Sequence, residues 1–144
     1  MRATMGGNLK RLSYTKSAGA LAIATLMVSG LAATGQAQAQ SLEGSWSGGG
    51  SVSFSSGAKE QARCRANYRR RTPDSYTLRA VCATPSARAE QTATVRRVGS
   101  NRFAGSFYNS EYNVSGSIYI VVRGGSQNVR LTSDAGWAHI RLSR

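Results

Sequence analysis

Residues 62–83 read ARCRANYRRRTPDSYTLRAVCA, and this stretch predicts a β-hairpin closed by a disulfide. Apolar and polar residues alternate on both sides of a central turn, which is the two-residue period of half-buried strands. Pro73 fixes φ and Asp74 can bond its own backbone, so both favour the turn. Strands that fold back symmetrically about Pro73 place Cys64 opposite Cys82, and these are the two cysteines of the chain.

The other face of this hairpin is cationic. The same register pairs Asn67 with Arg79 and places arginines along the outer face and the turn. Guanidinium groups bind phosphate and carboxylate through paired hydrogen bonds. We therefore expect this set to contact an anionic partner: Arg63, Arg65, Arg69, Arg70, Arg71 and Arg79. A merely solvated surface is the alternative, and the scarcity of aromatic residues among the arginines disfavours a stacking surface for nucleic acid.

The first 39 residues have the pattern of a secretory signal peptide. Basic residues come first, an apolar run follows at 18–33, and Ala37-Gln38-Ala39 is a small-residue cleavage site before Gln40. The run is shorter than the roughly 20 apolar residues of a spanning helix, so we expect no transmembrane segment after cleavage. The sequence thus predicts an exported protein, periplasmic or secreted, and its preference for arginine over lysine favours a bacterial source.

Residues 40–144 have the size of one domain. The chain carries 19 Lys and Arg against six Asp and Glu, and four of the basic residues precede Gln40, so this domain keeps a net charge of about +9. In an oxidising compartment two cysteines pair more often than they bind metal. We expect one disulfide, no metal site and no cofactor.

The domain alternates strands and turns without a helix. Strands are expected at about 45–54, 62–69, 76–83, 88–98, 102–108, 114–123 and 137–143, with one more around Val129 and Leu131. Gly48 to Gly50 indicate a bend or a close backbone approach in the first strand. Eight short strands favour a small all-β antiparallel meander, and closure into a barrel would remove both exposed edges. An open sandwich is the alternative.

The alternation also predicts which side chains point inward. They are Trp46, Val52, Phe54, Leu78, Val95, Phe103, Phe107, Ile118, Ile120, Val122, Leu131, Ile140 and Leu142.

Gly44-Ser45-Trp46 resembles the Gly-x-Trp signature that opens lipocalins and other calycins. In that family an arginine near the last strand packs across the tryptophan, and the resemblance implies that Arg141 or Arg144 is its counterpart. The length of the domain is similar to that of compact bacterial calycins such as periplasmic metalloprotease inhibitors. The resemblance implies an eight-stranded barrel that binds a ligand or a protease.

Catalytic motifs are missing from the sequence. The one histidine, His139, lies at an expected outward position, and no G-x-S-x-G or HExxH pattern occurs, so we expect no enzyme activity. The segment joining the strands at 102–108 and 114–123 mixes tyrosines with polar residues, a composition that binding surfaces favour. It is a candidate binding rim formed by Tyr108, Asn109, Glu111 and Tyr112; an ordinary loop is the alternative.

Three functions are compatible with these features. The leading hypothesis is a non-enzymatic binding module of the cell envelope that holds an anionic component or an acidic protein through the arginine-rich hairpin. A second is a protease inhibitor that presents residues 40–46 or a loop to an active site. A third is a carrier for a small apolar ligand, although the Phe, Ile and Val residues are expected to fill the interior of a barrel of eight strands.

The signal-peptide hypothesis predicts that the exported protein begins within a few residues of Gln40. The motivation is the Ala37-Gln38-Ala39 site. The intact mass of protein recovered from the periplasm or medium measures this directly. A species that still contains residues 21–31 would contradict it.

Overall fold

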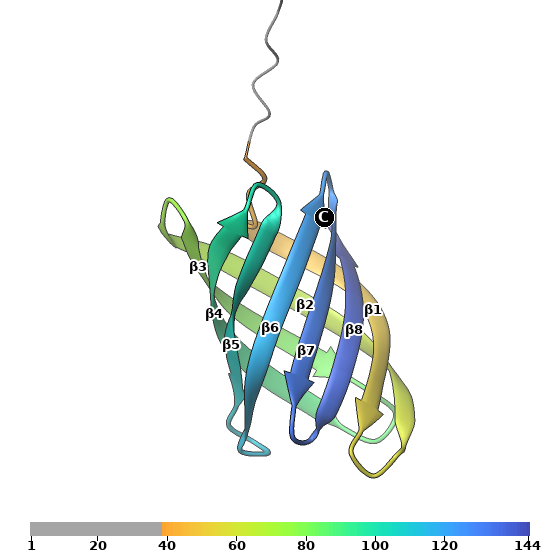
Figure 1. The fold of residues 1–144 in the computed structure, drawn as a ribbon. Coiled ribbons are helices and arrows are strands. Elements are labelled where there is room, and N and C mark those ends of the chain that lie inside the picture. The colour runs from red at the N-terminus through yellow and green to blue at the C-terminus, as the bar shows by residue number, and fades with distance from the viewer. Residues whose placement is uncertain (1–38) are drawn as a thin grey trace, which may run out of the picture. The chain divides into compact units, whose positions relative to one another are not determined.

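The computed structural model describes residues 39–144 and shows eight strands joined in a simple meander (Figure 1). Each strand pairs antiparallel with the next, and β1 also pairs with β8, so the sheet is a closed barrel. The strands are β1 (Gly44–Phe54), β2 (Lys59–Thr72), β3 (Ser75–Ala83), β4 (Arg88–Gly99), β5 (Arg102–Asn109), β6 (Val114–Arg123), β7 (Ser126–Ser133) and β8 (Gly136–Ser143). The predicted closed barrel is confirmed, and the open sandwich is excluded.

The predicted signal peptide lies outside the described residues except for Ala39. Within the part of the chain that is described, no helix is long and apolar enough to cross a membrane.

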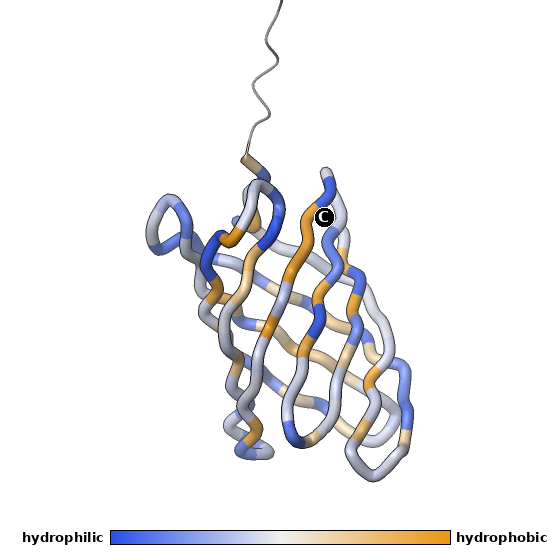
Figure 2. The backbone as a smooth tube through the Cα atoms, viewed as in Figure 1, coloured by the Kyte–Doolittle hydropathy of each residue, from blue (hydrophilic) through white to orange (hydrophobic). Residues whose placement is uncertain are grey.

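Side chains alternate between the inside and the outside of the barrel, and Figure 2 shows the matching change of hydropathy along the strands. The buried core includes most of the residues predicted to point inward, together with Leu42, Tyr68 and Tyr76. Val52, Phe54 and Leu131 also line the interior, but they are only half-buried. The physical reason is that one end of the barrel is open, as described below.

The register of the β2–β3 hairpin is the predicted one. Cys64 lies opposite Cys82, Asn67 lies opposite Arg79, and the two sulfurs are bonded. The cysteines are 18 residues apart. Closing a loop of this length stabilises a fold by about 3 kcal/mol in the chain-entropy model.

The glycines of β1 allow that strand to bend between its two neighbours. A Cβ atom on Gly48 would overlap the carbonyl oxygen of Arg141, and one on Gly50 would overlap that of His139. Both oxygens belong to the backbone of β8, so the close approach predicted for the glycine run is confirmed. It occurs along the β1–β8 seam that closes the barrel.

Replacing Gly50 by Ala should therefore weaken the closing seam. We expect a loss of about 1–3 kcal/mol in the free energy of unfolding, the usual cost of forcing atoms into a packed region. Gly125→Ala is the control, because a Cβ there meets no atom within 4 Å. Urea unfolding measures both variants, and equal stabilities would contradict the importance of the close approach.

Candidate functional site

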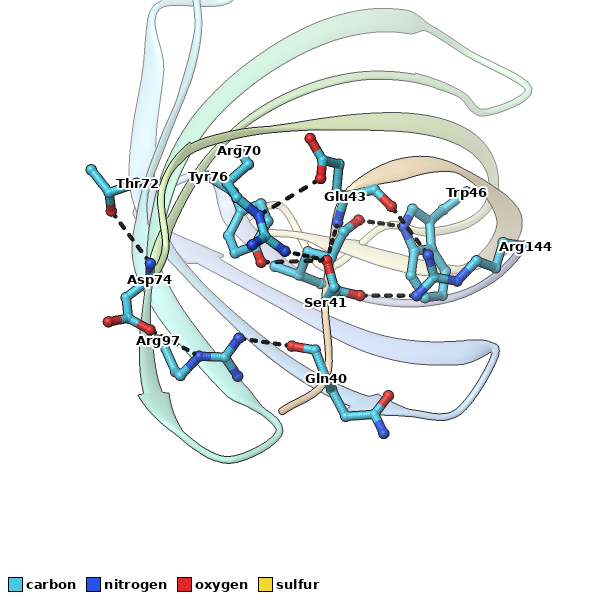
Figure 3. Close-up of polar contacts among 11 residues, drawn as sticks. Gln40, Ser41, Glu43, Trp46, Arg70, Thr72, Asp74, Tyr76, Arg97 and Arg144 are labelled. Atoms are coloured by element: carbon cyan, nitrogen blue, oxygen red, sulfur yellow. Dashed lines mark hydrogen bonds and ion pairs between the residues drawn. The ribbon is translucent and has the colours of Figure 1, made fainter. Parts of the chain in front are cut away.

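The two ends of the barrel differ. At one end lie residues 40–43, the β2–β3, β4–β5 and β6–β7 turns, and the C-terminus (Figure 1). Trp46 is buried there, and its indole Nε1 donates a hydrogen bond to the carbonyl oxygen of Leu42 at 2.7 Å. The guanidinium carbon of Arg144 lies 4.3 Å from the centre of the Trp46 ring. Arg144 also donates hydrogen bonds to the carbonyl oxygens of Ser41 and Glu43, so it fastens the N-terminal segment over this end (Figure 3).

Two further arginines cover aromatic rings at the same end. Arg70 lies 5.6 Å from the ring centre of Tyr76, and its side chain pairs with Glu43 at 3.6 Å. Arg97 lies 4.7 Å from the ring centre of Phe103 and donates a hydrogen bond to the carbonyl oxygen of Gln40. We call Arg70, Arg97 and Arg144, with residues 40–43, the lid. It closes this end of the barrel.

The lid bears on the protease-inhibitor hypothesis. Leu42 is completely buried and Trp46 is 2% exposed. The carbonyl groups of Gln40, Ser41 and Glu43 are all held by lid arginines. Residues 40–46 would have to detach from the barrel before they could enter an active site, so the geometry does not favour this segment as an inhibitory one.

A polar pair lies inside the barrel beneath the lid. The hydroxyl of Tyr68 donates a hydrogen bond to Oε1 of Gln127 at 2.8 Å, and both side chains are buried. Burial raises the pKa of Tyr68 well above its ordinary value, although the hydrogen bond with Gln127 acts in the opposite direction. The phenol therefore stays neutral. The hydrogen-bonded side chains of Tyr68 and Gln127 fill the interior of the barrel directly under the lid.

The opposite end is open and contains a cavity of about 300 Å³, which we call the cup. It lies between the ends of the strands near the β1–β2, β3–β4, β5–β6 and β7–β8 turns. Small residues dominate its wall. The lining residues are Val52, Ser53, Phe54, Ala62, Cys82, Thr84, Ser86, Ala87, Ala89, Gln91, Phe107, Asn109, Tyr112, Val114, Leu131, Ser133, Ala135, Gly136, Trp137, Ala138 and Ile140. The expectation that Phe, Ile and Val fill the interior is thus wrong for this half of the barrel.

The cup offers apolar contacts and a few polar atoms, and none of its lining residues is charged. Ser53 Oγ is buried without a hydrogen-bond partner among the described residues, but its pairing with Lys59 and Trp137 places it on the outward side of β1. The amide oxygen of Asn109 accepts a hydrogen bond from the backbone nitrogen of Tyr112. At the rim, Ser86 donates a hydrogen bond to Glu60, and hydrogen bonds from Thr84 and Ser86 lower the pKa of that carboxyl.

A smaller cavity of about 30 Å³ lies between the cup and the Tyr68–Gln127 pair. The two cavities share the side chains that separate them, namely Cys82, Gln91, Phe107, Leu131 and Ile140.

The four residues of the candidate rim do not lie together in the structure. Asn109 and Tyr112 line the cup, and Asn109 is buried there. Tyr108 lies on the outer wall beside Ser106 and Ser115, and Glu111 is exposed in the turn. The sequence pattern did not single out Ala62, Ala138 or Ser53, since small residues carry no signal until the strands are aligned.

The six candidate arginines also have different surroundings in the structure. Arg63, Arg65, Arg69 and Arg71 are exposed on the outer wall or beside the turn. Arg70 belongs to the lid, and Arg79 forms an ion pair with Glu90. The six side chains therefore do not form one unpaired cationic face.

The described residues contain no group of three or more His, Cys, Asp and Glu side chains that could hold a metal ion. His139 is exposed on the outer wall, as the alternation predicted, and its ring contacts Trp137 edge to face at 5.2 Å.

The lid geometry predicts that Arg144→Gln lowers stability by about 1–2 kcal/mol, because a cation–π contact and two hydrogen bonds are lost. Hydrogen exchange at the Trp46 indole should become faster, since residues 40–43 are no longer held. Arg123→Gln, on an exposed residue of β6, is the control and should change neither quantity. Unchanged exchange in Arg144→Gln would show that the segment is held without this arginine.

No protein-family model and no curated protein matches the chain. Solved structures share its fold. A redesigned β-barrel, mFAP1, bound to DFHBI, has a TM-score of 0.63 at 14% identity, over 76% of this chain and 100% of that one. A de novo designed fluorescence-activating β-barrel has a TM-score of 0.58 at 19% identity, over 76% and 98%. EF1p2_mFAP2b bound to DFHBI has a TM-score of 0.60 at 12% identity, over 75% and 98%. This likeness establishes the fold, an eight-stranded antiparallel barrel similar to the designed fluorescence-activating barrels.

Proposed function

We propose that this protein is a non-catalytic binder of a small, neutral, mainly apolar molecule, which it holds in the cup. One observation carries the proposal: the barrel is sealed at the lid and keeps an apolar cavity of about 300 Å³ at the other end. An interior filled only for stability would not leave such a space, because protein cores are close-packed. The volume is at the lower end of the range for small-molecule pockets.

The wall of the cup defines the chemistry of the ligand. A charged ligand would lose its hydration without gaining a partner of opposite charge, because no lining residue is charged. Phe107 and Tyr112 supply aromatic contacts that suit a ring or a short chain.

Two likenesses support the proposal. Arg144 packs over Trp46, which is the contact that the resemblance to calycins implies for Gly44-Ser45-Trp46. Some of the designed barrels of similar fold are bound to DFHBI. We infer that the chain is a compact calycin-like carrier. Export through the predicted signal peptide would place its ligand in the periplasm or outside the cell.

The proposal predicts that N-phenyl-1-naphthylamine, a neutral apolar fluorescent probe, binds the protein with saturation and gains fluorescence. Ala138→Phe should weaken this binding tenfold or more, because Ala138 is an inward residue of the cup wall and the added ring occupies the cavity. Ala83→Phe is the matched control, since Ala83 is exposed and lies outside the cup. Fluorescence titration measures all three proteins.

Ala87→Trp, at the half-buried edge of the cup, is a second blocking variant in case Ala138→Phe does not fold. Absence of saturable binding by the unmodified protein would refute the carrier function. Equal binding by the blocking variants and the Ala83→Phe control would show that the probe binds outside the cup. The cup would then not be the binding site.

A further inference from the structure

Closure of the barrel brings four arginines from three strands onto one part of the outer wall. Arg63 and Arg65 come from β2, Arg130 from β7 and Arg141 from β8. Strand β1 lies between β2 and β8, and its Gly49 pairs with Arg63 on one side and with Arg141 on the other. We call these four arginines around Gly49 the arginine groove.

The groove has a low floor because β1 carries no large side chain there. Two hollows, of about 460 Å³ and about 1040 Å³, meet over Gly49, Gly50 and Gln61. Arg130 and Arg141 line the first, and Arg63 and Arg65 line the second together with Arg88 of β4. Neighbouring strands are about 4.8 Å apart, so the backbones of Arg63 and Arg141 are about 10 Å apart across the floor.

The charge of the groove is not neutralised. All four arginines are exposed, and no acidic side chain within residues 39–144 lies at ion-pair distance from any of them. The acids that do pair with arginine are Glu43, Glu90 and Asp74, and their partners are Arg70, Arg79 and Arg97. Four like charges on a small surface attract anions and raise the local concentration of counter-ions.

We propose that the arginine groove binds a flexible linear polyanion through its phosphate groups. The planar fork of arginine pairs with phosphate through two hydrogen bonds, and arginines on both sides of the floor can hold successive phosphates of one chain. A recessed floor admits a chain, whereas a flat bilayer would touch only the raised edges. The hollow on the β2 side has no aromatic lining residue, and Tyr119 and His139 are the only aromatic residues that line the other hollow, so a base could stack on one side of the groove alone.

This site goes beyond the cup, and it changes the set of arginines expected to contact an anion. Arg63 and Arg65 keep that role, and Arg130 and Arg141 join them. Arg69 and Arg71 lie farther along β2 and do not line either hollow of the groove. They are therefore a control that removes two positive charges, as the loss of Arg63 and Arg141 does.

The test is a titration of fluorescently labelled inorganic polyphosphate, followed by anisotropy at about 0.15 M salt. Arg63→Gln/Arg141→Gln should weaken binding at least tenfold, while Arg69→Gln/Arg71→Gln should change it less than threefold. The dependence of log K on log salt should also become shallower by about one unit for each phosphate contact removed. Circular dichroism checks that both variants fold.

Equal losses in the two variants would show that net charge alone attracts the polyanion and would overturn the groove as a site. Absence of binding at this salt concentration would overturn it as well. Tighter binding of a single-stranded oligonucleotide, or of vesicles containing anionic phospholipid, than of polyphosphate would overturn the choice of partner.

Discussion

The pairing of β1 with β8 is the constraint on which the rest of the structure depends. It satisfies the backbone groups of two strands that would otherwise be open edges, and it needs a strand that approaches β8 without Cβ atoms at Gly48 and Gly50. The same pairing places Arg144 near Trp46 and Arg141 beside Gly49. The lid, the cup and the arginine groove all follow from closure, because each uses residues from both ends of the chain.

The sequence is informative where a local pattern decides the structure. Alternation about Pro73 predicts the pairing of Cys64 with Cys82. Side chains on a strand change face at every residue, so two cysteines that lie opposite each other must point to the same face of the hairpin. The cup is different, since its volume depends on Ala62, which pairs with Gly50, and Ala138, which pairs with Val52, lining the same end of the closed barrel. A small side chain has the same appearance in a sequence whether it borders a cavity or a packed core.

Arginine has three roles here, and composition alone does not separate them. In the lid, the guanidinium groups of Arg144, Arg70 and Arg97 lie over the rings of Trp46, Tyr76 and Phe103. Arg97 and Arg144 also donate hydrogen bonds to carbonyl oxygens, and Arg70 donates one to the Ser41 hydroxyl. The planar, weakly hydrated guanidinium suits these contacts better than the ammonium of lysine. On the outer wall, Arg79 is paired with Glu90. Arg63 and Arg141 lie on either side of Gly49, which places no side chain between them. The distinction lies in the partner of each side chain. Arg130 and Arg141 become neighbours of Arg63 only when the barrel closes.

The cup and the arginine groove share a strand but face opposite sides of it. Ile140 lines the cup, while His139 and Arg141 point outward beside the groove. Coupling between two sites requires an element with two arrangements that both ligands can bias. Strand β8 is paired on both sides, and a shift of one residue would move Ile140 to the surface and Arg141 into the core. With no second register available to β8, occupation of the groove should leave the affinity of the cup unchanged, and the barrel would act as a rigid support for the two proposed sites.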